Sequence, residues 1–297
     1  MHCFGIGPPM NYRHAFHAGN FADVVKHAVL ARILLHLGAK PAPYRVIDTH
    51  AGAGLYDLAG PEASRSGEWQ TGIARLFAAV RDAAGIDAAA RTLLAPYLDA
   101  VAARNPAGRL ATYPGSPALV AALLRRQDRL VVCEREPGAA AALKRNFAHD
   151  PRITAVAIDG WTALNAYVPP KERRGLVLVD PPYEETDDFA RLAQSFEAAH
   201  RKWATGIYVL WYPIKARAEP DALARRLRRS RIGKILRAEV DVAAPTIPLR
   251  LCGCGLIVVN PPWRLEQELK IMLPQLAGVL AAPERGACRL DWLSPEA

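Results

Sequence analysis

An acidic residue, two prolines and a tyrosine follow directly after a short apolar run. The run occupies 176–179, and Asp180, Pro181, Pro182 and Tyr183 come next. The exocyclic amine of a nucleobase is a poor nucleophile because its lone pair is delocalised into the ring, so an enzyme that alkylates it must orient both N–H groups. We expect Asp180 and the Pro181 carbonyl to accept them and Tyr183 to stack on an extruded base, a contact worth ~1–3 kcal/mol.

A second copy of this pattern, Asn-Pro-Pro-Trp, occupies 260–263 after another apolar run. The run before Asp180 is expected to lie beside the first strand of a parallel sheet, where ligands gather. The run before Asn260 is the last expected strand. If that last strand runs antiparallel to its neighbour, its carboxyl end lies at the opposite edge of the sheet. We therefore predict that Asp180 is the working residue and that Asn260 belongs to a structural turn.

A glycine-containing loop follows the first expected strand. The strand ends at Asp48, and His50, Gly52 and Gly54 come directly after it. Glycines at such a turn let a ligand approach the backbone where side chains would collide. A dinucleotide fingerprint needs a third glycine three residues after the second, and this chain has Asp57 there, which argues against an NAD dehydrogenase.

Polar residues at the ends of two further strands should converge on the same edge, because parallel strands present their carboxyl ends together. Glu134 ends one strand, where its carboxylate can accept hydrogen bonds from ribose hydroxyls, and Asp159 and Gly160 follow the next. The amino end of a helix at Ser116 favours an anionic group such as a carboxylate. Together these groups predict a site for a nucleoside joined to an amino acid, which S-adenosylmethionine fits.

Short β-branched runs alternate with helical patterns along most of the chain, as in βαβ units on a mostly parallel sheet. We therefore predict an α/β fold with a seven-stranded sheet and helices on both of its faces. The expected strands lie at 44–48, 129–134, 153–158, 175–180, 206–211, 235–242 and 255–260.

The first two strands are separated by about eighty residues, more than a simple crossover needs. Apolar residues at three- and four-residue spacing within 57–110 predict an inserted helical pair, over 63–80 and 85–104. The crossover helix is expected to begin with Ser116 as its N-cap and Pro117 as its first residue.

The amino-terminal residues 1–9 have neither a basic start nor a sustained apolar run, so they do not form a signal peptide. Met10 is then an alternative start. On this basis we expect an untidy leader over 1–9, the helical region and first strand of the main domain over 10–56, the insertion over 57–110, and the remainder of the main domain over 111–297.

The charge balance favours a polyanionic partner such as nucleic acid, because 38 Lys and Arg against 29 Asp and Glu give +9. Five cysteines form no Cys-x-x-Cys pair, so neither a disulfide framework nor a metal site is indicated. No stretch reaches the ~18 consecutive apolar residues of a membrane span. We expect a cytoplasmic, monomeric protein with no membrane contact and no obligate protein partner.

Two basic segments have both a functional and a structural interpretation. The first is an amphipathic helix that carries Lys26 and His27 in its first two turns, where they could face a carboxylate or RNA phosphates. His14 and His17, just before it, are expected to be ordinary half-buried histidines. The second is 225–234, which we expect to be a solvated helix face more often than an RNA contact.

Five motifs together resemble one known family. They are YRHAFHAGNFADVVKH at 12–27, DTHAGAG at 48–54, YPGSP at 113–117, DPPY at 180–183 and NPPW at 260–263. They closely resemble the RlmJ family of bacterial 23S ribosomal RNA adenine-N6 methyltransferases, over nearly the whole chain from Met10. The resemblance implies a Rossmann-like class I methyltransferase with a small helical insertion, which uses S-adenosylmethionine to methylate one adenine in 23S rRNA.

The resemblance also implies roles for individual residues. Asp180 would be the catalytic acceptor, with Pro181 and Tyr183 completing its motif, and Tyr12 would touch the RNA substrate. Cofactor contacts are implied for His27, His50, Ser116, Glu134, Asp159, Gly160 and Asp180, and we add Gly52, Gly54 and Lys26 from the residue patterns.

Three other functions share some of these features. A DNA adenine-N6 methyltransferase would carry the same Asp-Pro-Pro-Tyr motif, but normally with a larger region for duplex base readout than the insertion here. An enzyme that methylates glutamine amides faces the same lone-pair problem. A non-catalytic RNA-binding scaffold could keep the fold, but the intact set of Asp180, Tyr183 and Glu134 speaks against it.

Overall fold

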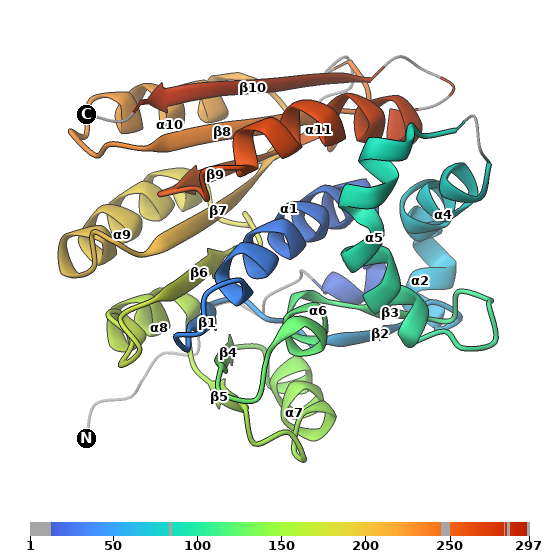
Figure 1. Ribbon diagram of the computed structural model, residues 1–297, viewed down its shortest axis with the longest axis horizontal. Helices are drawn as coiled ribbons and strands as arrows, with labels where there is room; N and C mark the ends of the chain where they lie inside the picture. The colour runs from blue at the N-terminus through green and yellow to red at the C-terminus, as the bar shows by residue number, and fades with distance from the viewer. Residues whose placement is uncertain (1–12, 83–84, 245–249, 282, 284–285, 296–297) are drawn as a thin grey trace.

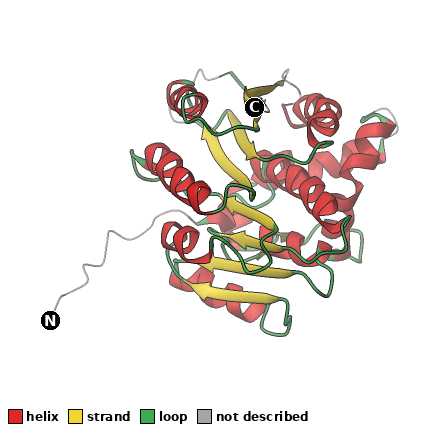
Figure 2. Ribbon diagram, turned by 60° about the vertical axis from the view of Figure 1, so that its left-hand side comes forward, coloured by secondary structure: helices red, strands yellow, loops and turns green. Residues whose placement is uncertain are grey.

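The computed structural model describes residues 13–82, 85–244, 250–281, 283 and 286–295. The expected leader over 1–9 and the expected RNA contact Tyr12 lie outside the described residues. The described chain forms one central sheet with helices packed on both faces (Figures 1 and 2).

The central sheet has eight strands in the order β10-β8-β9-β7-β6-β1-β4-β5. Five neighbouring strands, from β7 to β5, run parallel, and β9, β8 and β10 pair antiparallel. This confirms the α/β, Rossmann-like class. The strands are β1 (Arg45–Asp48), β4 (Arg129–Glu134), β5 (Ile153–Ala157), β6 (Gly175–Val179), β7 (Ile207–Ile214), β8 (Ile235–Asp241), β9 (Gly253–Val259) and β10 (Ala287–Ser294).

All seven expected strands overlap observed ones, but the expected count of seven was wrong. The eighth strand, β10, is an edge strand that pairs only with β8. Its first three residues are exposed, and Arg289 and Asp291 interrupt its apolar residues. Such a strand lacks the apolar run by which buried strands are recognised, so sequence pattern alone did not reveal it.

Helices cover the two faces of the sheet in two apolar clusters. One face packs against α1 (Phe21–Gly38), α6 (Ser116–Leu123), α7 (Pro137–Asn146) and α11 (Leu265–Ala281). The other packs against α8 (Gly160–Tyr167), α9 (Asp188–Lys202) and α10 (Ala218–Arg228). Strand β6 is buried along its whole length because both of its faces are covered.

Helix α1 is buried on every side over 22–31 and exposes Leu35 in its last turn, so the expectation of an amphipathic helix was wrong. It packs against α5 (Ala88–Ala103), α6 and α11 as well as against the sheet. Lys26 and His27 lie among its buried residues. A helix surrounded in this way needs apolar residues on every side, and its few polar groups must find partners inside the protein.

The insertion after β1 is more broken than a helical pair. A short ribbon of β2 (Leu55–Asp57) and β3 (Thr112–Pro114) frames it, and between them lie α2 (Pro61–Ser66), α3 (Glu68–Thr71), α4 (Ile73–Arg81) and α5. Gly67 adopts a left-handed φ of 64° between α2 and α3. At Gly72 the chain turns so that Ile73 N donates to Gly19 O at 2.9 Å, which fastens the insertion to the segment before α1.

The second Pro-Pro motif lies at the end of β9, which is antiparallel to β7 as expected. Asn260 Nδ2 donates to the carbonyls of Ala204 and Gly206 at 2.8 and 2.7 Å. These bonds hold the loop between α9 and β7, so Asn260 has a structural task at the edge away from Asp180.

The basic segment 225–234 continues from α10, whose Leu223 and Leu227 are buried. Two of its arginines form ion pairs, Arg226 with Glu197 at 2.8 Å and Arg228 with Asp291 at 3.1 Å. In the described part of the chain, no helix is both long and apolar enough to cross a membrane.

Replacing Gly72 by alanine should destabilise the protein by more than about 1 kcal/mol. A Cβ at this position would stand 2.1 Å from Gly19 O, so the insertion and the Gly19 turn could not keep their distance. Gly278→Ala is the control, because nothing lies within 4 Å of a Cβ there and alanine favours a helix by up to ~1 kcal/mol. Urea unfolding measures both; an unchanged midpoint for Gly72→Ala would contradict this packing.

Candidate active site

A cavity of ≈ 1100 Å³ opens at the carboxyl edge of the parallel strands. Its walls come from the residues that follow β1, β4, β5 and β6, from the start of α6, and from η1 (His14–Phe16) with the first turns of α1. Ten of the expected site residues line it: Lys26, His27, His50, Gly52, Ser116, Glu134, Asp159, Gly160, Asp180 and Tyr183.

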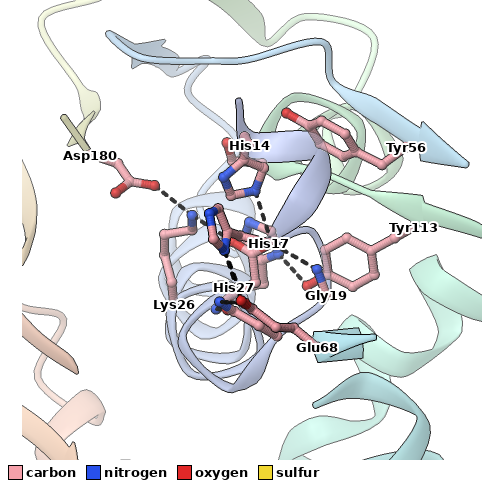
Figure 3. A network of polar contacts seen from close by, with 12 residues as sticks. His14, His17, Gly19, Lys26, His27, Tyr56, Glu68, Tyr113 and Asp180 are labelled. Atoms are coloured by element: carbon pink, nitrogen blue, oxygen red, sulfur yellow. Dashed lines mark hydrogen bonds and ion pairs between the residues drawn. The ribbon is translucent and has the colours of Figure 1, made fainter. Parts of the chain in front are cut away.

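An ion-pair network lies at the cavity beside the end of β6. Lys26 Nζ lies 2.5 Å from Asp180 Oδ2 and 2.8 Å from Asp23 Oδ1. His14 Nε2 lies 3.0 Å from the second oxygen of Asp23, which also accepts from Gly19 N at 2.9 Å. Figure 3 shows the Lys26 side chain reaching from α1 toward Asp180, with His14 above it. Lys26, which was expected to contact the cofactor, lines the cavity and is also paired with Asp180.

Burial and charge oppose each other in this network. Burial lowers the pKa of Lys26, but the carboxylates of Asp180 and Asp23 more than offset it and leave that pKa well above its ordinary value. Burial likewise raises the pKa of Asp23, yet His14 and Lys26 bring it well below its ordinary value. Asp23 and Lys26 are therefore charged at neutral pH, although both are buried.

Asp180 follows β6 and keeps one oxygen available. Its Oδ2 accepts from Lys26, and within the part of the chain that the structure describes its Oδ1 accepts no hydrogen bond. Thr49 N donates to Leu178 O at 3.1 Å, so the end of β6 is tied to the loop after β1, as expected from their adjacency. The carboxylate thus stands with one oxygen anchored and the other able to accept a donor from a ligand.

Tyr183 is held by its hydroxyl group. Its Oη donates to Trp211 O at 2.7 Å, and the ring packs against Phe189 and Trp211 at centroid distances of 4.8 and 5.8 Å. The backbone of Tyr183 has a left-handed φ of 53°. Burial, with nearby carboxylates, raises the pKa of Tyr183 well above its ordinary value, so the phenol is neutral. Pro181 is buried and is not among the residues that line the cavity.

Gly52 and Gly54 adopt left-handed φ values of 59° and 77°. A Cβ on Gly52 would stand 2.1 Å from Tyr56 Oη, and one on Gly54 would stand 2.5 Å from Phe147 Cε2. Both glycines are therefore required by conformation and by space. Gly52 N donates to Glu134 Oε2 at 2.8 Å, which connects the loop after β1 to the end of β4, whereas Gly54 lies outside the cavity lining.

The two other strand-end acids are also anchored by backbone donors. Glu134 Oε1 accepts from the amides of Arg135 and Glu136, each at 2.7 Å, and Asp159 caps α8 by accepting from Thr162 N at 2.9 Å. These bonds fix the carboxylates at the cavity wall and leave lone pairs for ligand hydroxyl or amino groups. Gly160 packs so closely on His50 that a Cβ would stand 2.4 Å from its Nε2.

His27 and His50 are neutral. Burial lowers the pKa of His27 to about 3 and that of His50 to about 4. His27 Nδ1 lies 2.7 Å from Tyr113 Oη, whose oxygen lies 2.9 Å from Tyr97 Oη. Its Nε2 is buried and has no hydrogen-bond partner among the described residues. The expected cationic role of His27 is therefore wrong, because a buried imidazole without a carboxylate partner stays neutral.

The hydroxyl of Ser116 does not cap α6. Gly115 is the N-cap, and Ser116 Oγ donates to Asp48 Oδ2 at 2.6 Å. Burial raises the pKa of Asp48 to about 6, despite this hydrogen bond. The N-cap expectation was wrong by one residue, because Gly115 has the extended backbone of an N-cap, with φ −66° and ψ 178°, and Ser116 is already the first residue of the helix.

Three residues of the site were not identified from sequence: Asp23, Asp48 and Tyr113. Asp23 stands three residues before Lys26 on one helix face, a spacing typical of ion pairs, so a signal was present. Asp48 was noted only as the end of a strand. Tyr113 had no signal, since β3 brings it to His27 across 86 positions of chain. No group of three or more metal-ligating side chains occurs among the described residues.

Comparisons with known proteins agree on one family. A family model described as "Ribosomal RNA large subunit methyltransferase D, RlmJ" matches residues 41–294. The Ribosomal RNA large subunit methyltransferase J of Escherichia coli (strain K12) is 39% identical over 287 residues, which cover 97% of this chain and 100% of the relative. The protein of the same name from Haemophilus influenzae is 38% identical, with the same coverage.

A solved structure is also similar over most of its length. It is a crystal structure of a protein from Legionella pneumophila strain Philadelphia 1, 32% identical in sequence, with a TM-score of 0.84. The match covers 93% of this chain and 98% of that one.

Replacing Lys26 by methionine should cost about 3–5 kcal/mol of stability, because two carboxylates would lose the charge between them. Adding Asp23→Asn to Lys26→Met should recover part of the lost stability, because it removes one of the two unpaired carboxylates. Lys40→Met is the control, since Lys40 is exposed, and it should change stability by no more than about 0.5 kcal/mol. The free energy of unfolding in urea measures all three; equal stability of Lys26→Met and Lys40→Met would contradict the network.

Asp48→Asn should stabilise the protein at pH 8. The raised pKa of Asp48, about 6, means that the folded state binds its proton more tightly than the unfolded state, so stability falls as pH rises from about 4 to 6. The penalty, on the order of 2–3 kcal/mol above pH 6, is absent in the amide. The free energy of unfolding of both proteins is measured from pH 4 to 8. The stability of Asp48→Asn relative to the wild type should increase between about pH 4 and 6. A stability difference that does not change with pH would refute the raised pKa.

Proposed function

Since the chain belongs to the RlmJ family of ribosomal RNA large subunit methyltransferases, we propose that it methylates the exocyclic N6 of a specific adenine in 23S rRNA. The methyl donor is S-adenosylmethionine. The observation that carries the proposal is the position of Asp180: one oxygen is fixed by Lys26, and the carboxylate lies in one cavity with Glu134 and Tyr183.

The donor set of the cavity fits S-adenosylmethionine. Glu134, fixed by three backbone amides, would accept from the ribose hydroxyls, and Asp159 with Gly160 would face the adenine. His27 Nε2, which has no hydrogen-bond partner in the part of the chain that the structure describes, and the amino end of α6 would face the methionine part. When bound, the cofactor supplies a methyl group activated by a positively charged sulfur.

Asp180 and its neighbours would orient the acceptor. The free Oδ1 accepts one N–H of the adenine amine and the Pro181 carbonyl accepts the other, which directs the nitrogen lone pair away from both. The Tyr183 ring, held through Trp211 O, supports the base by stacking. The nitrogen becomes acidic once it has formed its new bond, so a carboxylate is basic enough to take the released proton.

Lys26 would act through Asp180. Its ammonium occupies Oδ2 at 2.5 Å and so prevents the carboxylate from rotating to offer that oxygen. The positive charge of Lys26 also offsets the negative charge of the Asp180 carboxylate while its other oxygen binds a neutral amine. Lys26 is thus a positioning residue in this proposal.

Asp180→Asn should lower methyl transfer by at least about 10²-fold. The amide keeps the shape of the side chain, but only one of its two terminal atoms can accept a hydrogen bond, and it cannot act as a base. Affinity for S-adenosylmethionine should change little. A radiolabel assay with single-turnover kinetics measures transfer, and calorimetry measures cofactor binding. Lys144→Met, at an exposed position of α7, serves as a control that should retain full activity. Loss of cofactor binding in Asp180→Asn would show instead that Asp180 contacts the cofactor.

The substrate class is tested directly. Wild-type protein is incubated with radiolabelled cofactor and, in parallel, protein-free large-subunit rRNA, tRNA and duplex DNA, and each nucleic acid is digested to nucleosides. Label in N6-methyladenosine from rRNA alone supports the proposal. Label in DNA would favour the DNA methyltransferase, and binding of RNA with no label anywhere would favour a scaffold without activity.

A further inference from the structure

A row of arginines lies at the amino edge of the sheet, opposite the cavity. Arg45 begins β1 and Arg129 begins β4, and the two are register partners. Arg152 directly precedes β5 and Arg174 directly precedes β6, which flank these strands. Because neighbouring strands are ~4.8 Å apart, the backbones of these four arginines span roughly 15 Å along the edge.

The loops around this row carry much of the chain's excess charge. We define the amino-edge surface as residues 38–45, 124–129, 147–152 and 168–174. These segments hold nine Lys and Arg against three Asp and Glu, a net +6 within a chain of net +9. The surface therefore concentrates the positive charge on one edge of the sheet.

Each of the three carboxylates is already paired with an arginine. The pairs are Arg125 with Asp128, Arg152 with Asp150 and Arg45 with Glu172, at 2.8, 2.6 and 2.8 Å. Among the described residues, the remaining six cations have no carboxylate partner: Lys40, Arg126, Arg129, Lys171, Arg173 and Arg174. The surface therefore keeps a net positive charge, and an external anion would be stabilised here.

Part of the surface is a hollow of ≈ 400 Å³ lined by Arg126, Arg129, Pro151 and Arg152. Arg152 donates to Leu124 O and Ala121 O at 2.6 and 3.1 Å, and Arg129 donates to Arg126 O and Asp128 O at 3.0 and 2.8 Å. These bonds fix two of the guanidinium groups in advance, which lowers the entropy cost of binding a phosphate.

We propose that the amino-edge surface is a second binding surface for the rRNA backbone, separate from the cavity that receives the target base. The inference rests on the proposed function for the identity of the RNA. A row of cations matches the regular phosphates of a nucleic acid strand, and arginine forks match phosphate oxygens. Of the residues that the structure describes, the exposed large apolar ones are Leu35, Trp263 and Ile271, and none of them lies in this surface, so it offers no anchor for a lipid membrane.

The test compares two variants with equal loss of charge. Arg126→Gln with Arg173→Gln removes two exposed cations from the amino-edge surface, and Arg104→Gln with Arg109→Gln removes two exposed cations from the insertion. The dissociation constant for a long fragment of protein-free large-subunit rRNA is measured between about 50 and 200 mM salt. Equal midpoints of urea unfolding in all three proteins show that the variants are folded.

We expect the amino-edge variant to bind the fragment several-fold more weakly and its salt slope to fall by about 1.4 to 1.8, since each phosphate contact contributes about 0.7 to 0.9. The insertion variant should keep the slope of the wild type. Equal slopes in both variants would overturn the proposal, as would unchanged RNA binding with lost binding to vesicles of anionic phospholipid. The comparison measures binding and needs no methyl transfer, so a failure of the proposed activity is a separate result.

Discussion

The structure of the site depends on one buried ammonium group placed between two carboxylates. Lys26 lies in the buried part of α1 and bridges Asp23, from its own helix, to Asp180, from the end of β6. A charge in that position is tolerated only because both of its partners are present and one of them is itself paired with His14. The ion pairs therefore tie the amino-terminal segment to the sheet at the point where a ligand would bind.

The insertion packs against the segment that carries these ionic residues, on the side away from the sheet. Its α5 buries the outer side of α1, and Gly72 brings its backbone against Gly19. His17 and Asn20 reach Glu68 of α3 at 3.0 Å, and Tyr97 of α5 reaches His27 through Tyr113. The segment that carries the ionic residues is thus clamped between two parts of the chain, so that positions far from the cavity help determine its shape.

Much of the fold and the general place of the site could be predicted from sequence, because they follow from local patterns. Apolar runs identified the buried strands, and the polar residue after each run, Asp48, Glu134, Asp159 and Asp180, falls at a shared edge in any parallel sheet. The turn formed by the left-handed glycines after β1 could also be predicted from the sequence. The edge strand β10 was not predicted, because half-exposed strands lack an apolar run.

Which polar group meets which was decided only by the tertiary structure. Lys26 faces Asp180 across 154 positions of chain and Tyr113 faces His27 across 86, and no periodicity records such pairings. The protonation of His27 and Asp48 follows from burial that the helices of the insertion and the neighbouring strands impose together. The sequence by itself determined the residue types and the sheet edge to which they belong, whereas partners, charges and free oxygens depend on packing between distant segments.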